Sequence, residues 1–149
     1  MKSLVIFFSA EGTTASAAKQ LAELKHADLF EIRPEKPYTA ADLRYTNPLA
    51  RCNIEFFRKR DVPVIGAVDH FEAYDTVMIG FPIWYGCAPN VVNTCCKAYN
   101  WTGKTVYLFA TSGGSGIGKT VEKLSPYLKG ASIKDARVIT SVQELADWQ

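Results

Sequence analysis

The sequence predicts an α/β protein built on an open parallel sheet with helices on both faces, which is a doubly wound, three-layer arrangement. Apolar runs of strand length alternate along the chain with segments of helical periodicity. Several of these runs are apolar throughout, as in parallel strands that are buried on both faces. With 149 residues, 48% hydrophobic and 21% charged, the chain has the composition of one globular domain, and we expect residues 1–149 to form it.

The first elements are a strand, a helix and a second strand. "SLVIFFS" (3–9) is a continuous apolar run, and "ADLFEIR" (27–33) is the next strand-like segment. Between them, "TASAAKQLAEL" (14–24) has helical periodicity. One stripe of this helix is expected to face the sheet, and it consists of Ala17, Ala18, Leu21 and Leu24.

Residues 35–72 form a connection that is long for an α/β domain, and it contains Pro37, Pro48 and Pro63. We expect one or two helices in it, of which "PLARCNIEFFRKR" (48–60) is the better candidate, followed by an irregular return. Connections of this length usually serve a function or carry structure of their own.

The second half of the chain resumes the alternation. Its elements are expected to be a strand at 75–84, a helix at 90–100, a strand at 104–112, a helix at 119–129, a strand at 136–141 and a short helix at 142–149. Pro89 stands just before the first of these helices, an accepted position, and Pro126 is expected to interrupt the second.

Several classes of function are disfavoured by composition. The net charge of +2 is too small to indicate nucleic-acid binding, and the basic cluster at 58–60 is expected to be a solvated helix end. No apolar stretch approaches the roughly 20 residues of a membrane span, and no signal-peptide pattern is present, so we expect a cytoplasmic protein. The four cysteines lack the spacing of metal ligands and are expected to be small buried hydrophobes.

Three loops are expected at the carboxyl ends of the strands, where open α/β sheets bind ligands. In the first, "SAEGTT" (9–14), the hydroxyls of Ser9, Thr13 and Thr14 and the flexible Gly12 precede a helix whose free N–H groups favour an anion. The loop carries no Lys or Arg, so neutral donors would hold the anion. The alternative is a Ser/Thr-rich helix cap without a ligand.

The second loop, "PIWYGCAP" (82–89), places Trp84 and Tyr85 at the same edge of the sheet. Core packing would account for one aromatic residue, but two beside a phosphate site suggest a platform for a flat ring.

The third loop belongs to "GGSGIGKT" (113–120), which matches the P-loop pattern of nucleotide-binding proteins. A P-loop enzyme also needs an acidic residue at the end of another strand for Mg²⁺, and more chain for a second substrate. Only residues 121–149 follow, and the strand among them ends in Ser141. A glycine-rich loop that lies flat against a ring edge fits better, with Lys119 an ordinary residue of the helix start.

These segments together resemble the flavodoxin-like family. "FFSAEGTT" (7–14) is similar to the S-x-T-G-N-T phosphate loop of flavodoxins, with Glu11 where Thr is usual and Thr13 where Asn is usual. "GFPIWYG" (80–86) and "TSGGSGIG" (111–118) resemble the longer motifs of one flavodoxin-like family. The resemblance covers nearly the whole chain and is weakest over residues 39–72.

The resemblance implies a flavodoxin-like sheet of strand order 2-1-3-4-5 and noncovalently bound FMN. The implied phosphate site is the loop that contains Glu11, with contacts from Ser9, Gly12, Thr13 and Thr14. The residues implied to flank the flavin ring are Pro82, Ile83, Trp84, Tyr85 and Gly86. Backbone contacts to the pyrimidine edge of the ring are implied for Thr111, Ser112, Gly113 and Gly114.

Two functions follow from the resemblance and stay open at this point. The chain is an electron carrier that serves partner proteins, or it is an FMN-dependent enzyme that uses NAD(P)H to reduce a quinone or another small acceptor. Many carriers of this fold are acidic, whereas this chain has a pI near 8.3, which favours the enzyme slightly.

Overall fold

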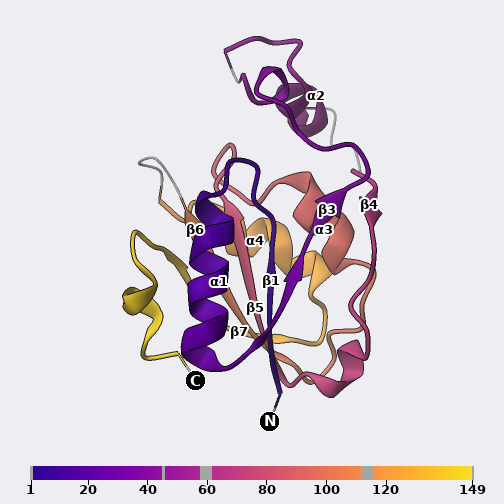
Figure 1. The fold of residues 1–149 in the computed structure, drawn as a ribbon. Coiled ribbons are helices and arrows are strands. Elements are labelled where there is room, and N and C mark those ends of the chain that lie inside the picture. The colour runs from indigo at the N-terminus through magenta and orange to yellow at the C-terminus, as the bar shows by residue number, and fades with distance from the viewer. Residues whose placement is uncertain (1, 45, 58–61, 112–115, 149) are drawn as a thin grey trace.

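The computed structural model of the chain describes residues 2–44, 46–57, 62–111 and 116–148. A parallel sheet of order β2-β1-β5-β6-β7 lies at its centre (Figure 1). The strands of this sheet are β1 Ser3–Phe7, β2 Asp28–Glu31, β5 Thr76–Pro82, β6 Thr105–Thr111 and β7 Ser132–Val138. Numbered within the sheet by their order in the chain, they run 2-1-3-4-5, so the expected fold class and strand order are confirmed.

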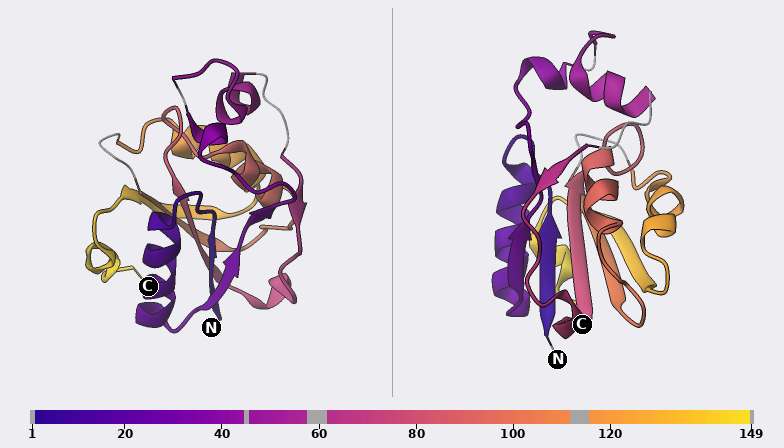
Figure 2. Two further views of the ribbon diagram at one scale, coloured as in Figure 1. Left: turned by 45° about the horizontal axis from the view of Figure 1, so that its top comes forward. Right: turned by 90° about the vertical axis from the view of Figure 1, so that its right-hand side faces the viewer.

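Helices cover both faces of the sheet (Figure 2). Helix α1 (Thr13–Lys25) lies on one face, and α3 (Asn90–Cys96) and α4 (Thr120–Leu124) lie on the other. The side chains of β1 alternate between the two cores: Leu4 and Ile6 pack on the α3 side, whereas Val5 packs beneath α1. Every residue of β1 after the first is buried, which explains the unbroken apolar run in the sequence.

The C-terminal segment closes the α1 face with a 3-10 helix, η4 (Val142–Leu145), where the sequence predicted a short helix. Trp148 is buried and stacks on Tyr107 at a ring distance of 4.8 Å. The indole N–H of Trp148 donates to Asp135, and this hydrogen bond is the main cause of the lowered pKa of the Asp135 carboxyl. These contacts attach the end of the chain to β6 and β7.

Residues 35–63 leave the sheet and return to it, and we call this segment the excursion. Its base is an antiparallel pair, β3 (Arg33–Pro34) with β4 (Val64–Ile65). It contains the 3-10 helix η1 (Ala41–Leu43) and helix α2 (Arg51–Phe57), and it lies beyond the carboxyl ends of the strands (Figures 1 and 2). A second 3-10 helix, η2 (Phe71–Ala73), follows the excursion and leads into β5.

Several expectations are wrong in detail. The buried face of α1 begins at Thr14 and continues through Ala18, Leu21 and Ala22, so Leu24 is turned outward and is 42% exposed. The last strand, expected at 136–141, spans Ser132–Val138, because an edge strand tolerates polar residues that a purely apolar criterion rejects.

Helix α3 ends at Cys96, before the expected residue 100, because the chain turns there and stacks Tyr99 on Phe71 at 4.5 Å. Helix α4 gives way to a 3-10 helix, η3 (Ser125–Tyr127), at the expected proline. The candidate helix at 48–60 is present as α2, while the basic cluster at 58–60 lies outside the described residues.

The expectation that the cysteines are small buried residues is confirmed. All four cysteines are buried and unpaired with one another. Within the described ranges, no group of His, Cys, Asp and Glu residues could hold a metal ion. In the same ranges, every helix is too short or too polar to cross a bilayer.

Gly80 in β5 provides a test of the packing beneath α1. A Cβ atom at this position would lie 2.1–2.7 Å from atoms of the fully buried Phe109 ring. We expect Gly80→Ala to lower the free energy of unfolding by about 1–3 kcal/mol, measured by urea denaturation, because the close-packed core cannot take up the methyl group.

Gly116→Ala is the matched control, since a Cβ there would meet no atom within 4 Å. Equal stability of the two variants would contradict the close packing of Gly80 against Phe109.

Candidate functional site

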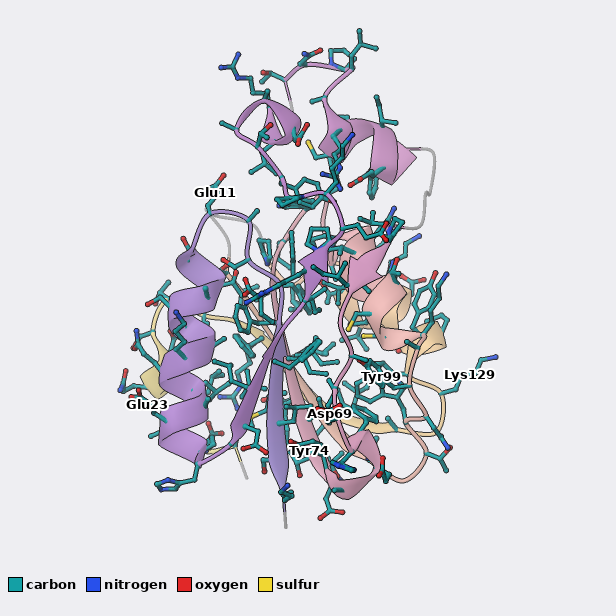
Figure 3. All side chains as sticks on the ribbon, turned by 45° about the vertical axis from the view of Figure 1, so that its right-hand side comes forward. Glu11, Glu23, Asp69, Tyr74, Tyr99 and Lys129 are labelled. Carbon is teal, nitrogen blue, oxygen red and sulfur yellow. The ribbon has the colours of Figure 1, made fainter. Side chains whose placement is uncertain are left out.

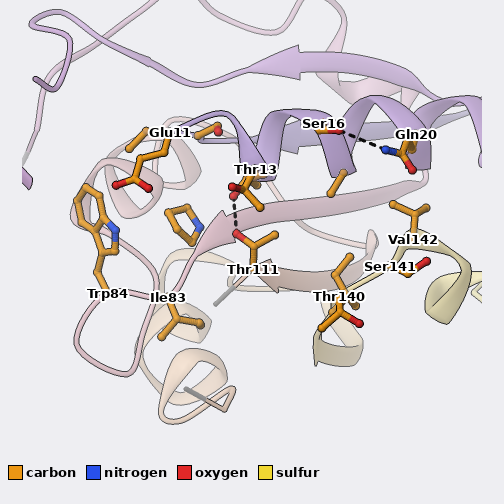
Figure 4. A pocket seen from close by; sticks show the side chains of 16 residues that line it. Glu11, Thr13, Ser16, Gln20, Ile83, Trp84, Thr111, Thr140, Ser141 and Val142 are labelled. Carbon is orange, nitrogen blue, oxygen red and sulfur yellow. Dashed lines mark hydrogen bonds between the residues drawn. The ribbon is translucent and has the colours of Figure 1, made fainter. Parts of the chain in front are cut away.

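A cavity of about 780 Å³ opens where the strands end (Figure 4). Four segments form its walls: the β1–α1 loop with the start of α1, the end of β5, the end of β6, and the residues after β7. The lining residues are Ser9, Ala10, Glu11, Thr13, Thr14, Ser16, Ala17, Gln20, Pro82, Ile83, Trp84, Thr111, Ile139, Thr140, Ser141 and Val142. A volume of this size is typical of sites for cofactors and small molecules.

The β1–α1 loop is shaped so that the first turn of α1 faces the cavity. Gly12 has a φ of 98°, a left-handed conformation that glycine adopts without steric cost, and its N–H donates to the Ser9 hydroxyl at 3.0 Å. No described side chain caps the N-terminus of α1. The first N–H groups of the helix and the positive end of its dipole therefore remain suited to an anion.

The polar groups of this loop differ in exposure. Thr13 is exposed and lines the cavity, whereas Thr14 is 2% exposed. Glu11 is exposed at the tip of the loop beyond the start of α1 (Figure 3), where solvent screens its carboxylate. Among the described lining residues, Glu11 is the one acidic residue, and none is basic.

A buried hydrogen bond joins the two sides of the cavity. The hydroxyls of Thr14 on α1 and Thr111 at the end of β6 lie 2.8 Å apart (Figure 4). The carbonyl of Thr111 also accepts the N–H of Ile83 at 3.0 Å, which extends the pairing of β6 with β5 to the cavity wall. Thr111 therefore fixes the position of the segment after β1 relative to the segment after β5.

Trp84 is the aromatic side chain that lines the cavity, and its orientation is set by two rings that meet it edge to face. Phe8 lies at a ring distance of 5.7 Å and Tyr38, from the excursion, at 5.4 Å. Such arrangements are favourable for aromatic pairs and fix the plane of the ring. Trp84 thus presents a rigid apolar wall.

Tyr38 is held in turn by helix α2. Its hydroxyl donates to the Glu55 carboxylate, and Arg51 donates to the other oxygen of that carboxylate at 2.8 Å. The Arg51 guanidinium also lies 4.0 Å from the centre of the Tyr38 ring. Burial, and next the bond to Glu55, raise the pKa of Tyr38 far above its ordinary value, so the phenol stays protonated.

After Trp84 the chain makes a tight two-residue turn. The N–H of Trp84 donates to the Cys87 carbonyl at 2.9 Å, and the N–H of Cys87 donates back to the Trp84 carbonyl at 3.1 Å. Both central residues have positive φ, 55° at Tyr85 and 78° at Gly86, as in a type I′ turn. Glycine accepts this conformation freely, whereas for a tyrosine it costs about 1–3 kcal/mol.

The turn is in contact with the loop that leads into α4. The N–H of Lys119 donates to the Gly86 carbonyl at 2.9 Å. A Cβ atom at Gly118 would lie 2.4 Å from that carbonyl oxygen, so glycine is required there for the two loops to approach each other. The side chain of Lys119 is exposed and is not part of the cavity lining.

The structure brings most of the predicted site residues together. Those that line the cavity are Ser9, Glu11, Thr13, Thr14, Pro82, Ile83, Trp84 and Thr111. Gly12 shapes the loop between them, while Tyr85 and Gly86 lie in the turn next to the cavity, with the Tyr85 ring directed to helix α2. Ser112, Gly113 and Gly114 lie outside the described residues.

Two groups of lining residues were missed by the sequence analysis. Ser16 and Gln20 follow Thr13 at helical spacing, but a polar stripe on a helix looks the same when it faces solvent. Thr140 and Ser141 follow β7, and they were assigned to the strand because its end was placed three residues too late. The available signal was the rule that loops after parallel strands meet at one edge.

The model of the family named flavodoxin matches residues 2–149. The chain belongs to the flavodoxin family. No match is found among the curated proteins. The family assignment agrees with the strand order and with the position of the cavity.

Solved structures agree with this assignment. A Bacteroides eggerthii protein assigned as a flavoprotein is 38% identical with a TM-score of 0.91, and the alignment covers 99% of this chain and 94% of that one. A Bacteroides uniformis protein assigned likewise has the same identity and TM-score, with coverage of 99% and 96%. A Lactobacillus acidophilus flavoprotein in complex with FMN has 22% identity, a TM-score of 0.77 and coverage of 99% and 97%, and it supports the fold.

The buried pair of hydroxyls gives a testable prediction. Thr111→Val leaves the Thr14 hydroxyl buried without this partner, so we expect a loss of about 1–3 kcal/mol in the free energy of unfolding. In the double variant with Thr14→Val both polar groups are gone, and the loss should be smaller than the sum of the two single losses. Urea denaturation of all four proteins measures this, and additive losses would show that the bond contributes nothing specific.

Proposed function

We propose that this flavodoxin-family chain forms one domain over residues 1–149, binds FMN in the cavity at the strand ends, and transfers electrons to partner proteins in the cytoplasm. The observation that carries the proposal is the pairing, in one cavity, of an uncapped helix N-terminus with a fixed aromatic wall. FMN supplies the redox chemistry, since its ring can accept one or two electrons.

The β1–α1 loop fits the phosphate group. Its first-turn N–H groups and the hydroxyls of Ser9 and Thr13 are donors on one side of the cavity, and Gly12 lets the backbone approach an anion closely. Hydrogen bonds to a charged group contribute about 1.5–3 kcal/mol each, so several neutral donors can hold a phosphate without a Lys or Arg. Membership of the flavodoxin family supports this assignment of the β1–α1 loop to the FMN phosphate.

The wall formed by Trp84, with Pro82 and Ile83 beside it, fits the flavin ring. An aromatic side chain whose plane is fixed by Phe8 and Tyr38 offers a stacking surface at little cost in conformational entropy. The carbonyl at Gly86 lies in the adjacent turn, and residues 112–114 are proposed to contact the pyrimidine edge. Apolar surfaces on the ring side and polar donors on the phosphate side match the two ends of FMN.

A second candidate is an NAD(P)H-dependent reductase of a quinone or another small acceptor. The observation that favours it is the net charge of +2, because an electron carrier that docks on basic partners is expected to be acidic. The FMN phosphate is proposed to occupy the neutral donors of the β1–α1 loop, and the described residues of the cavity wall include no Lys or Arg for the further phosphates of a nicotinamide nucleotide. We therefore place the carrier first.

The phosphate assignment predicts a difference between two flavins. FMN should bind with a one-to-one stoichiometry and far more tightly than riboflavin, which lacks the phosphate. Thr13→Ala should weaken FMN binding by about 1–3 kcal/mol and leave riboflavin binding unchanged, because the exposed hydroxyl is lost without disturbing the core. Isothermal titration calorimetry of the apoprotein measures both.

Lys119→Ala is the control for this experiment, and it should bind FMN like the wild type. If riboflavin binds as tightly as FMN, the loop is not a phosphate site. Tight binding of MgATP that is lost in Lys119→Ala would instead revive the P-loop interpretation of residues 113–120.

The choice between carrier and reductase is open to a direct measurement. When the FMN-loaded protein is mixed with NADH or NADPH without oxygen, we expect the visible flavin absorbance to persist for many minutes, because the described cavity offers no cation to the nucleotide. A chemical reductant such as dithionite should bleach it at once, which shows that the flavin is accessible to electrons. Rapid bleaching by NAD(P)H, followed by recovery on addition of a quinone, would replace the carrier with the reductase.

A further inference from the structure

Tyr85 is a strained residue at the edge of the proposed flavin site. Its left-handed conformation is unfavourable for a side chain with a Cβ, and persists only when its surroundings enforce it. The two hydrogen bonds between Trp84 and Cys87 close the turn but do not require a tyrosine at this position. The contacts of the Tyr85 side chain must therefore contribute to holding the turn.

Those contacts are made with helix α2 of the excursion. The Tyr85 ring stacks on Phe56 at a ring distance of 4.3 Å and an interplanar angle of 24°. Its hydroxyl donates to the side-chain oxygen of Asn53 and lies 3.5 Å from the sulfur of Cys52. Partial burial raises the pKa of Tyr85, so the phenol keeps the proton that it donates.

The same helix also holds the residue before the turn. The Glu55 carboxylate accepts a hydrogen bond from the Tyr38 hydroxyl, and the Tyr38 ring meets Trp84 edge to face. Helix α2 thus contacts Tyr85 directly and Trp84 through one intermediate ring. On its other side the turn is held by the N–H of Lys119, which donates to the Gly86 carbonyl.

We propose that Tyr85 is a positioning residue, through which helix α2 sets the orientation of the Gly86 peptide toward the flavin, while Tyr38 links the same helix to the Trp84 ring. The inference rests on the proposed FMN site for its redox consequence. The link between α2 and the turn is a property of the chain itself. The excursion then serves to stabilise one geometry of the turn from Trp84 to Cys87, and the strain at Tyr85 is offset by the contacts with Phe56 and Asn53.

The link is tested in the apoprotein by hydrogen exchange of individual amides. In Phe56→Ala, the amides of Trp84 and Cys87 should exchange roughly 5–30 times faster than in the wild type, since the contact that offsets the strain is lost. The amide of Ile83, bonded to the Thr111 carbonyl, should not change. Leu49→Ala is the control, because Leu49 lies in the same excursion and is 80% exposed.

Unchanged exchange at Trp84 and Cys87 overturns the link, as does an equal increase at Ile83 and throughout the sheet, which would mean general destabilisation. If Phe56→Ala does not fold, Phe56→Leu retains apolar volume without a stacked ring and should give the same local increase. None of these measurements requires bound flavin.

The redox consequence is tested in the FMN-loaded protein by a double-mutant cycle. In Tyr85→Gly, the glycine adopts the left-handed conformation without steric cost, and the side-chain contacts with Phe56 and Asn53 of α2 are lost. The midpoint potential should shift in the same direction in Phe56→Ala, Tyr85→Gly and the double variant, and the double variant should shift no further than Tyr85→Gly alone. A potential moves only when the affinities for oxidised and reduced flavin change unequally, so a purely structural loss would leave it in place.

Unshifted potentials, or shifts that add in the double variant, would overturn the positioning role. Failure of the wild-type apoprotein to bind FMN would overturn the proposed function instead, and the exchange measurements would still decide whether α2 holds the turn. The two inferences can therefore fail separately.

Discussion

Backbone pairing of β5 with β1 on one side and with β6 on the other determines where three of the four segments of the pocket lie. Phe7 is paired with Gly80, and Pro82 with Thr111, so the three strands end at one edge. A loop follows each strand directly, so the loops after β1, β5 and β6 begin side by side at this edge. The hydrogen bond between Thr14 and Thr111 then joins the first turn of α1, which follows β1, to the end of β6.

The chemistry of the pocket follows from what these loops contain. Threonine and serine hydroxyls and the backbone N–H groups of a helix start are neutral donors, and they suit an anion whose charge is already shared among several oxygens. The glycine-rich segment after β6 resembles a P-loop because it also joins a strand to a helix. The structure gives one of its glycines a different role, since Gly118 lies against the Gly86 carbonyl and allows two loops to touch.

The excursion adds to the pocket a set of contacts that the central sheet alone does not provide. A two-strand base made of β3 and β4 carries α2 to a position beyond the strand ends. From there, Arg51 and Glu55 hold Tyr38 against Trp84, while Phe56 stacks on Tyr85. Helix α2 thus contacts Tyr85 directly and Trp84 through the Tyr38 ring. On the positioning role proposed above, the conformation of the turn therefore depends on the position of this helix.

The sequence by itself determined the fold class, the strand order that the family resemblance implied, and three of the four segments that line the pocket, because buried parallel strands require long apolar runs and their loops must meet at one edge. It did not determine the end of β7, the buried face of α1 or the direction of the Tyr85 side chain. Polar residues on an edge strand or on a helix look alike whether they face solvent or a cavity. Only the tertiary structure decided that the Thr14 side chain points inward to Thr111. The same holds for the neighbours Trp84 and Tyr85, of which the first lines the cavity and the second packs on helix α2. The reason is that these orientations are set by contacts between residues far apart in the sequence, which no local pattern reveals. Trp84 packs against Phe8 and Tyr38. Tyr85 has a left-handed conformation and contacts Asn53 and Phe56, about thirty positions earlier in the chain.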